Sequence, residues 1–228
     1  MSEGPGGVLF DLDGTLLDHE AAVRSALLAW LSGYMLTRGE VEDLIPLWLE
    51  VEERHYATWR SGEISFQEQR RRRLRDFLPV VGVSPREDRL DSIFGDYLTA
   101  YEHNWTAYDD ARPALTMVAS AGLRVGVLTN GQREQQTAKL VATGLSHLCG
   151  DIFASSALAA AKPDPRAYLA ACRGLGLPPA EVLMVGDHYE VDVVGARAAG
   201  LHAVHLDRSG QDRRPEPHRI TTLRELRV

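Results

Sequence analysis

Two carboxylates follow a short apolar segment near the start of the chain. Residues 8–18 read VLFDLDGTLLD, so Asp11 and Asp13 are two positions apart and Gly14 comes directly after them. Because side chains alternate along an extended backbone, Asp11 and Asp13 can face one site if Leu12 turns away. Two close carboxylates repel each other, and a divalent cation such as Mg²⁺, which takes oxygen ligands, would offset that repulsion. A simple Asp-Gly turn is the alternative interpretation.

Three further polar motifs occur later in the chain, each after an apolar or alanine-rich segment. They are Thr129-Asn130-Gly131 after 123–128, Lys162-Pro163-Asp164-Pro165 after 159–161, and Gly186-Asp187 after 182–185, with Asp192 five residues beyond. In an open parallel sheet, ligands bind beyond the carboxyl ends of the strands. We therefore expect these motifs to gather beside Asp11 and Asp13. Taken singly, each motif could also be a turn, a surface lysine or a helix cap.

The segments that must position these groups have the pattern of an α/β domain. Five short apolar runs have the length of buried strands: Val8–Phe10, Leu123–Leu128, Asp151–Phe153, Val182–Val185 and Ala203–Leu206. Helices are expected at 113–121, 132–143 and 165–175, each closed by a glycine. Strands that alternate with helices at this spacing predict a Rossmann-like, doubly wound parallel sheet with both faces covered.

Residues 19–104 have helical periodicity and no convincing strand. The clearest apolar stripe consists of Leu90, Ile93, Phe94, Tyr97, Leu98 and Tyr101. We expect an all-helical domain at 19–104, inserted into a core domain formed by 1–18 and 105–228. The arginines at 70–73 lie in this insert, and four consecutive helical residues cannot share one face. We interpret them as a solvated surface, the alternative being that one binds a second anionic group of a substrate.

The composition excludes several classes of protein. The chain has 228 residues and a formal net charge of -7, which disfavours a general nucleic-acid binder. Cys149 and Cys172 are far apart and match no metal spacing, so we expect free thiols in a reducing compartment, the alternative being a single disulfide. The first residues, MSEGPGG, do not resemble a signal peptide, and no apolar run has the length of a membrane span. We expect a cytoplasmic protein with no membrane or nucleic-acid partner; its oligomeric state is not predicted.

Together the motifs resemble those of the haloacid dehalogenase (HAD) superfamily. The matching segments are DLDGT at 11–15, TN at 129–130, KPDP at 162–165 and GDHYEVD at 186–192. They occur in the family's order, and the helical insert is similar to that family's C1 cap. The resemblance therefore covers essentially the whole chain.

This resemblance implies a catalytic role for three aspartates. Asp11 would be the nucleophile that attacks phosphorus and forms an aspartyl-phosphate. Asp13 would protonate the leaving alkoxide and then deprotonate the attacking water. Asp11, Asp187 and the backbone carbonyl of Asp13 would hold Mg²⁺.

The resemblance also implies which residues bind the phosphoryl group. Thr129 and the backbone after it, at Asn130 and Gly131, would form hydrogen bonds to it. Lys162 would offset charge between the nucleophile and the phosphate, and Asp192 would position Lys162 or a metal-bound water. A site built from a cation, a lysine and hydrogen-bond donors suits phosphoryl transfer, in which positioning and charge neutralisation dominate.

The function implied is a Mg²⁺-dependent phosphatase acting on a small phosphorylated metabolite, because a cap that closes over the site leaves room for small substrates. Haloacid dehalogenation and sugar-phosphate mutase chemistry are the alternatives within the family. Dehalogenases of the family usually lack an acid at the position of Asp13, whereas a mutase would keep all four motifs. A non-catalytic binding protein is a third alternative, but such proteins commonly lose the nucleophile or the lysine.

Overall fold

The computed structural model describes residues 4–34 and 36–228. The chain divides into two compact units, of which one contains the residues up to His19 and those from Thr106 onward, and the other contains Glu20–Trp105. Each boundary lies one residue later than the sequence suggested.

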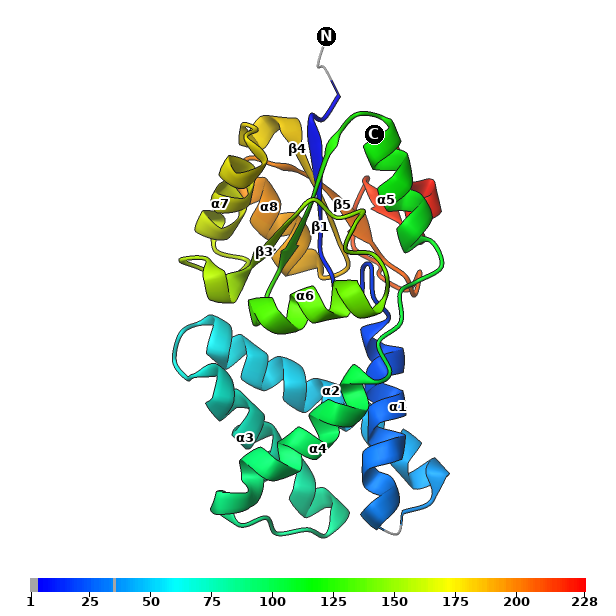
Figure 1. The fold of residues 1–228 in the computed structure, drawn as a ribbon, viewed down its shortest axis with the longest axis vertical. Coiled ribbons are helices and arrows are strands. Elements are labelled where there is room, and N and C mark those ends of the chain that lie inside the picture. Colours follow the sequence, from blue (N-terminus) through cyan, green and yellow to red (C-terminus); the bar gives the residue numbers. More distant parts are fainter. Residues whose placement is uncertain (1–3, 35) are drawn as a thin grey trace. The chain divides into compact units, whose positions relative to one another are not determined.

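A parallel sheet forms the centre of the first unit (Figure 1). Within the described residues it has six strands in the order β3-β2-β1-β4-β5-β6, and every neighbouring pair is parallel. The strands are β1 (Gly7–Phe10), β2 (Arg124–Thr129), β3 (Asp151–Ala154), β4 (Val182–Gly186), β5 (His202–Leu206) and β6 (Arg219–Ile220). The chain builds outward from β1 to β3 and then returns to place β4 on the other side of β1. This reversal leaves a ligand-binding position beyond the carboxyl end of β1.

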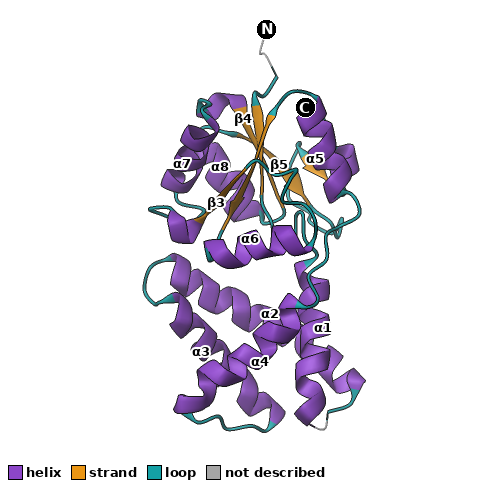
Figure 2. Ribbon diagram, viewed as in Figure 1, coloured by secondary structure: helices purple, strands orange, loops and turns teal. Residues whose placement is uncertain are grey.

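Helices cover both faces of this sheet (Figure 2). They are α5 (Ala111–Ser120), α6 (Arg133–Ala142), α7 (Pro165–Leu175), the π-helix η6 (Tyr189–Val194) and α8 (Gly195–Ala198). Val8 and Phe10 of β1 share one apolar core with residues of α5 and α6. Leu9, which points the opposite way, shares a second core with residues of α7 and α8. This arrangement confirms the predicted α/β fold with a Rossmann-like, doubly wound sheet.

Strand positions agree with the apolar runs in the sequence, except at the C-terminal edge of the sheet. β6 was not predicted, because two residues carry no recognisable periodicity. It pairs with β5 through His205–Arg219 and Leu206–Ile220. Among the described residues, no helix is both long and apolar enough to cross a bilayer.

The second unit is helical throughout its described residues. Its helices are α1 (His19–Leu31, whose first residue belongs to the other unit), α2 (Arg38–Arg60), α3 (Phe66–Phe77) and α4 (Leu90–Glu102). Trp48 is fully buried at the centre, with its ring 4.9 Å from that of Phe77. Its indole N–H donates to the hydroxyl of Tyr97 at 3.0 Å. The unit therefore has an aromatic core of its own.

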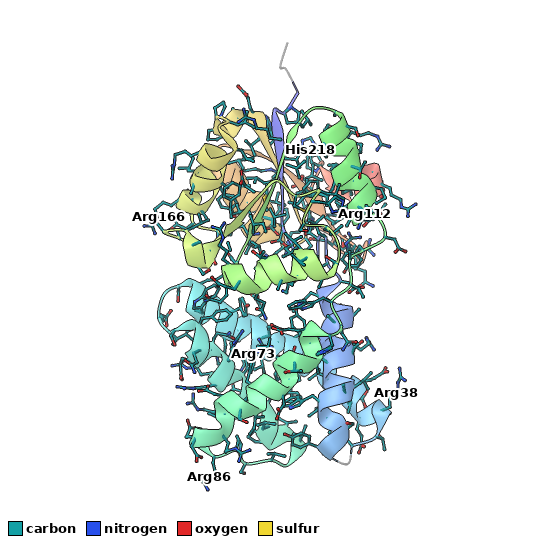
Figure 3. The ribbon with its side chains drawn as sticks, viewed as in Figure 1. Arg38, Arg73, Arg86, Arg112, Arg166 and His218 are labelled. Carbon is teal, nitrogen blue, oxygen red and sulfur yellow. The ribbon has the colours of Figure 1, made fainter. Side chains whose placement is uncertain are left out.

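The interpretation of residues 70–73 as a solvated surface is wrong for Arg73. Its side chain lies among α2, α3 and α4 (Figure 3) and is only 3% exposed. The guanidinium lies 4.5 Å from the Trp48 ring and 2.9 Å from a carboxylate oxygen of Glu52. Ion pairing and the aromatic face stabilise the charge, and the aliphatic stem packs like an apolar side chain. Arg71 and Arg72 remain partly exposed, as expected.

Cys149 and Cys172 are both buried, free thiols. Burial raises the pKa of the Cys149 thiol to about 12 and that of the Cys172 thiol to about 11. A reactive thiolate is therefore disfavoured at either position.

Candidate active site

Asp11 continues β1 at its carboxyl end. Its backbone N–H donates to the carbonyl of Val185 in β4 at 2.9 Å, so the residue is fixed between the central strands. Its side chain is almost fully buried. The predicted nucleophile therefore lies at the reversal point of the sheet, where this class of fold binds ligands.

Lys162 joins Asp11 to Asp192. The ammonium nitrogen lies 2.6 Å from Asp11 Oδ1 and 2.6 Å from Asp192 Oδ1, and all three side chains are buried. Lys162 comes from the loop that follows β3, and Asp192 comes from the π-helix η6, an element often found at functional sites. This contact is the one expected of a residue that positions Lys162.

Asp187 is held against the first motif by Thr15. The Thr15 hydroxyl donates to Asp187 Oδ1 at 3.1 Å and accepts from the Asp187 backbone N–H at 3.1 Å. Gly14 permits this approach, because its φ is +84° and a Cβ there would lie 2.4 Å from Asp187 Oδ2. The glycine of DLDGT thus makes room for a carboxylate distant in sequence.

Carboxylate oxygens of Asp11, Asp187 and Asp192 lie within 4.8 Å of one another. Burial raises the pKa of Asp11 to about 7, against the opposing charge of Lys162. Burial and then the charge of Asp11 raise the pKa of Asp187 well above its ordinary value. One lysine therefore does not neutralise the group, and this set of oxygen donors fits a hard divalent cation such as Mg²⁺.

The motif after β2 contacts the loop that carries Lys162. The Asn130 side chain donates to the Lys162 carbonyl at 2.8 Å and accepts from the Lys162 N–H at 2.9 Å. Gly131 N–H donates to Ser155 Oγ at 2.9 Å. The Asn130 side chain thus fixes the loop that carries Lys162, whereas the Gly131 N–H, one of the predicted phosphate-binding groups, is engaged within the protein. The Thr129 hydroxyl accepts from Gln136 Nε2 at 3.2 Å.

Two side chains of α6 reach the site and were not identified from the sequence. Lys139 Nζ lies 2.7 Å and 2.6 Å from the two carboxylate oxygens of Asp13. Gln136, one turn earlier, donates to Thr129 and, at 3.4 Å, to Asp13. Both are buried on the helix that follows the Thr129 motif, but the sequence alone does not show which face of that helix is buried.

Lys139 determines the charge state of Asp13 in the free protein. Burial alone would raise the pKa of Asp13, but the charges of Lys139 and His19, together with hydrogen bonds, lower it below its ordinary value. The pKa of Asp13 is therefore lowered and that of Asp11 is raised, although the two residues are only two positions apart. Environments that shift two carboxyl groups in opposite directions are a common basis for separate catalytic roles.

Arg208 holds the backbone of the first motif. Its guanidinium donates to the carbonyls of Gly14 at 3.1 Å and Thr15 at 2.6 Å, and it lies 2.9 Å from Asp110 Oδ1. The segment 207–218 is polar and contains prolines, a composition that is typical of a surface loop. That interpretation is wrong for its first residues, since Asp207 is buried and Arg208 faces the motif. A polar, proline-containing composition gave no indication of this contact.

A comparison with known protein families shows the family of the chain. A family profile described as haloacid dehalogenase-like hydrolase matches residues 6–200. The chain belongs to this family. As a HAD-like hydrolase it is an enzyme of the superfamily that its four motifs resemble.

Relatives of this HAD-like hydrolase include both phosphatases and dehalogenases. It is 34% identical, over 69% of its length, to phosphoserine phosphatase of Thermus thermophilus, of which it spans 63%. It is 36% identical to phosphatase MT3486 of Mycobacterium tuberculosis, over 90% of this chain and 89% of that protein. It is 31% identical to (S)-2-haloacid dehalogenase 4A of Burkholderia cepacia, over 96% of this chain and 91% of that protein. The relatives therefore leave both chemistries open.

A solved structure agrees with the fold of this HAD-like hydrolase. The HAD hydrolase YfnB of Bacillus subtilis superposes with a TM-score of 0.83 at 21% identity, over 98% of this chain and 97% of that chain. At this level of identity the likeness concerns the fold alone.

Replacing Lys162 by alanine is expected to lower the free energy of unfolding of this HAD-like hydrolase by about 3–5 kcal/mol, the cost typical of breaking a buried ion pair. The lysine is 2% exposed, and its loss leaves Asp11 and Asp192 without their shared cation. Urea titration measures the effect. Adding Asp192→Asn should recover part of the loss, and a single variant as stable as the wild type would contradict the assignment.

Proposed function

We propose that this HAD-like hydrolase is a Mg²⁺-dependent phosphatase that hydrolyses phosphate monoesters of small metabolites through an aspartyl-phosphate at Asp11. The observation that carries the proposal is Asp13, a second carboxyl group held by Lys139 at the end of the nucleophile strand. An alkoxide leaving group needs a proton, whereas a halide leaves as a stable anion. An acid at this position therefore favours phosphate esters over haloacids.

The first half-reaction transfers the phosphoryl group to the protein. An Asp11 oxygen bonds to phosphorus while the bond between phosphorus and the ester oxygen breaks, and the proton of the Asp13 carboxyl group passes to that oxygen. Because Lys139 favours the ionised form of Asp13 before substrate binds, this proton enters with the substrate or from solvent. The products are an alcohol and phosphorylated Asp11.

The second half-reaction restores the enzyme. Asp13 takes a proton from a water molecule, whose oxygen attacks phosphorus while the bond to Asp11 breaks. Inorganic phosphate is released, and Asp11 is again a carboxylate beside Lys162. Lys162 and the Thr129 hydroxyl would hold the phosphoryl oxygens in both steps. When bound by Asp11, Asp187 and the backbone carbonyl of Asp13, Mg²⁺ would supply the positive charge that the buried acidic group lacks.

The connections of the helical unit support a small substrate. Asp18 N–H donates to the Thr106 carbonyl at 3.0 Å, and Tyr108 N–H donates to the Leu16 carbonyl at 3.0 Å. The segments that lead into and out of Glu20–Trp105 are thus joined a few residues after Asp13. A folded domain attached beside a nucleophile loop can act as a lid that admits small molecules and excludes water. We therefore expect a small phosphorylated metabolite as substrate, rather than a protein, nucleic acid or membrane.

A substrate screen tests the proposed function. Purified protein with Mg²⁺ would be incubated with a panel of phosphorylated metabolites, phosphopeptides, 5′-phosphorylated oligonucleotides and (S)-2-haloacids. Release of inorganic phosphate from metabolites, without halide release, is the expected result. Halide release without phosphate release would favour the dehalogenase alternative. An isomerised sugar phosphate without free phosphate would favour a mutase.

Asp13→Asn should lower kcat by roughly 10²–10⁴ for an alkyl phosphate, the range typical of a lost acid–base group. The loss should be smaller for p-nitrophenyl phosphate, because p-nitrophenolate needs little protonation as it leaves. The measurement is kcat for both substrates. Asp151→Asn, an exposed aspartate at the amino end of β3, is the matched control. Equal losses for both substrates would exclude Asp13 as the general acid.

A further inference from the structure

The two lysines of the chain have the same kind of partner. Of the 25 Lys and Arg residues, two are lysines, Lys139 and Lys162. Lys162 contacts Asp11, and Lys139 contacts Asp13. Both ammonium groups are buried, with residue exposures of 3% for Lys139 and 2% for Lys162. Each of the two catalytic aspartates thus has a lysine of its own, in a chain that otherwise uses arginine for positive charge.

Lys139 contacts both oxygens of the Asp13 carboxylate. Lys139 Nζ lies almost equally far from the two oxygens, at 2.7 Å and 2.6 Å. An ionised carboxylate has about four lone-pair positions, and Lys139 and Gln136 make three contacts with it, so a position on Oδ1 remains for a leaving group or a water. A lysine ammonium is a compact point charge, whereas an arginine guanidinium is a broad planar fork. The compact group suits a buried position between two oxygens.

Gln136 connects the Lys139–Asp13 pair with the Thr129 motif. Its side-chain N–H groups contact Asp13, the Thr129 hydroxyl and the Asn130 carbonyl at 3.4, 3.2 and 3.1 Å. Gly131 makes room for it, because its φ is +152° and a Cβ there would lie 2.5 Å from Gln136 Nε2. Lys139 is one turn further along α6. The helix that follows the Thr129 motif therefore carries two groups directed at Asp13.

We propose that Lys139 is a positioning residue for Asp13, which holds the carboxyl group in place for both proton transfers of the phosphatase reaction. The inference rests on the proposed function. A separate ammonium group for each aspartate also keeps Asp13 from competing with Asp11 for Lys162. A displacement of about 1 Å at a reacting group can cost on the order of 10²-fold in rate, so loss of this restraint should be measurable.

A double-mutant cycle tests the proposal. Asp13→Asn, Lys139→Met and the double variant would be compared with the wild type on an alkyl phosphate and on p-nitrophenyl phosphate. Lys139→Met should lower kcat by about 10²-fold on the alkyl phosphate, and by less on p-nitrophenyl phosphate, with KM little changed. The double variant should be no slower than Asp13→Asn alone. Arg133→Met, which removes an exposed cation from the first turn of α6, is the control.

A second measurement shows the pair in solution without relying on activity. Because there are only two lysines, protein labelled with ¹⁵N-lysine has two side-chain ammonium signals. Asp13→Asn should shift one of them, and Lys139→Met should remove that same signal while the other persists, which also shows that the variant is folded.

The outcomes separate this inference from the proposed function. The inference is supported if Lys139→Met lowers kcat more on the alkyl phosphate than on p-nitrophenyl phosphate, and if the double variant is no slower than Asp13→Asn alone. Three results would overturn it while phosphatase activity stands. They are an equal loss of kcat on both substrates in Lys139→Met, additive losses of kcat in the double variant, and lysine signals that Asp13→Asn does not shift. A wild type that releases no phosphate from any ester would overturn the proposed function and this inference with it.

Discussion

Asp11→Asn is expected to abolish phosphate release while the protein remains folded. An amide keeps the shape of the side chain but is a poor nucleophile, and no aspartyl-phosphate can form on it. The loss in kcat should exceed the roughly 10²–10⁴ typical of removing an acid–base group. The assay is inorganic phosphate released from the best substrate of the screen.

The same variant should be at least as stable as the wild type in the absence of metal. Burial raises the pKa of Asp11 to about 7, so the fold favours its protonated form. The stability contributed by that form is present below the ordinary pKa and is lost as the pH rises through about 7. A neutral asparagine avoids this loss, and thermal unfolding at pH 8 should show an equal or higher Tm. Residual turnover near the wild-type rate, with Asp151→Asn unaffected, would contradict the nucleophile assignment.

Removal of divalent cations should also abolish activity, and Mg²⁺ should restore it. Carboxylate oxygens of Asp11, Asp187 and Asp192 lie within 4.8 Å of one another, one lysine contacts two of these groups, and the substrate adds further negative charge. Without a cation, the substrate would meet an acidic site whose ionised form is already disfavoured by burial. The measurement is phosphate release in excess chelator and after re-addition of Mg²⁺.

Asp187→Asn provides the matched variant for the metal experiment. It keeps a side chain that can bond to Thr15 but removes one charged oxygen donor from the group. The Mg²⁺ concentration that gives half-maximal activity should therefore rise. In the wild type, Mg²⁺ should raise the Tm, because a ligand that binds the folded state stabilises it. Full turnover in excess chelator would refute the metal assignment.

The apolar runs predicted most of the fold, and the four motifs predicted the main contacts of the site. Apolar runs marked β1 to β5 closely, because buried parallel strands are continuous apolar segments. The polar residues after them converge, since parallel strands end at one edge of the sheet. Asp11, Lys162 and Asp192 meet for this reason, although Asp11 and Lys162 are 151 positions apart.

Residues outside the motifs could not be found in this way. Lys139 and Gln136 lie on an amphipathic helix, where a polar residue on the buried face cannot be told from one on the exposed face until the helix is docked. Arg208 acts on backbone carbonyls, which have no counterpart in the side-chain pattern. Arg73 is buried through partners on α2 and α4, which are distant in sequence.

Trapping the covalent intermediate tests the central claim most directly. The enzyme would be mixed with a phosphate monoester or with (S)-2-chloropropionate, quenched in acid and reduced with borohydride. Borohydride converts an aspartate that carries a phosphoryl group or an ester to homoserine. Peptide mapping then locates the modified residue. Homoserine at position 11 is expected with the phosphate ester, and unmodified Asp11 is expected with the haloacid. Homoserine at position 11 with the haloacid alone would contradict the central claim.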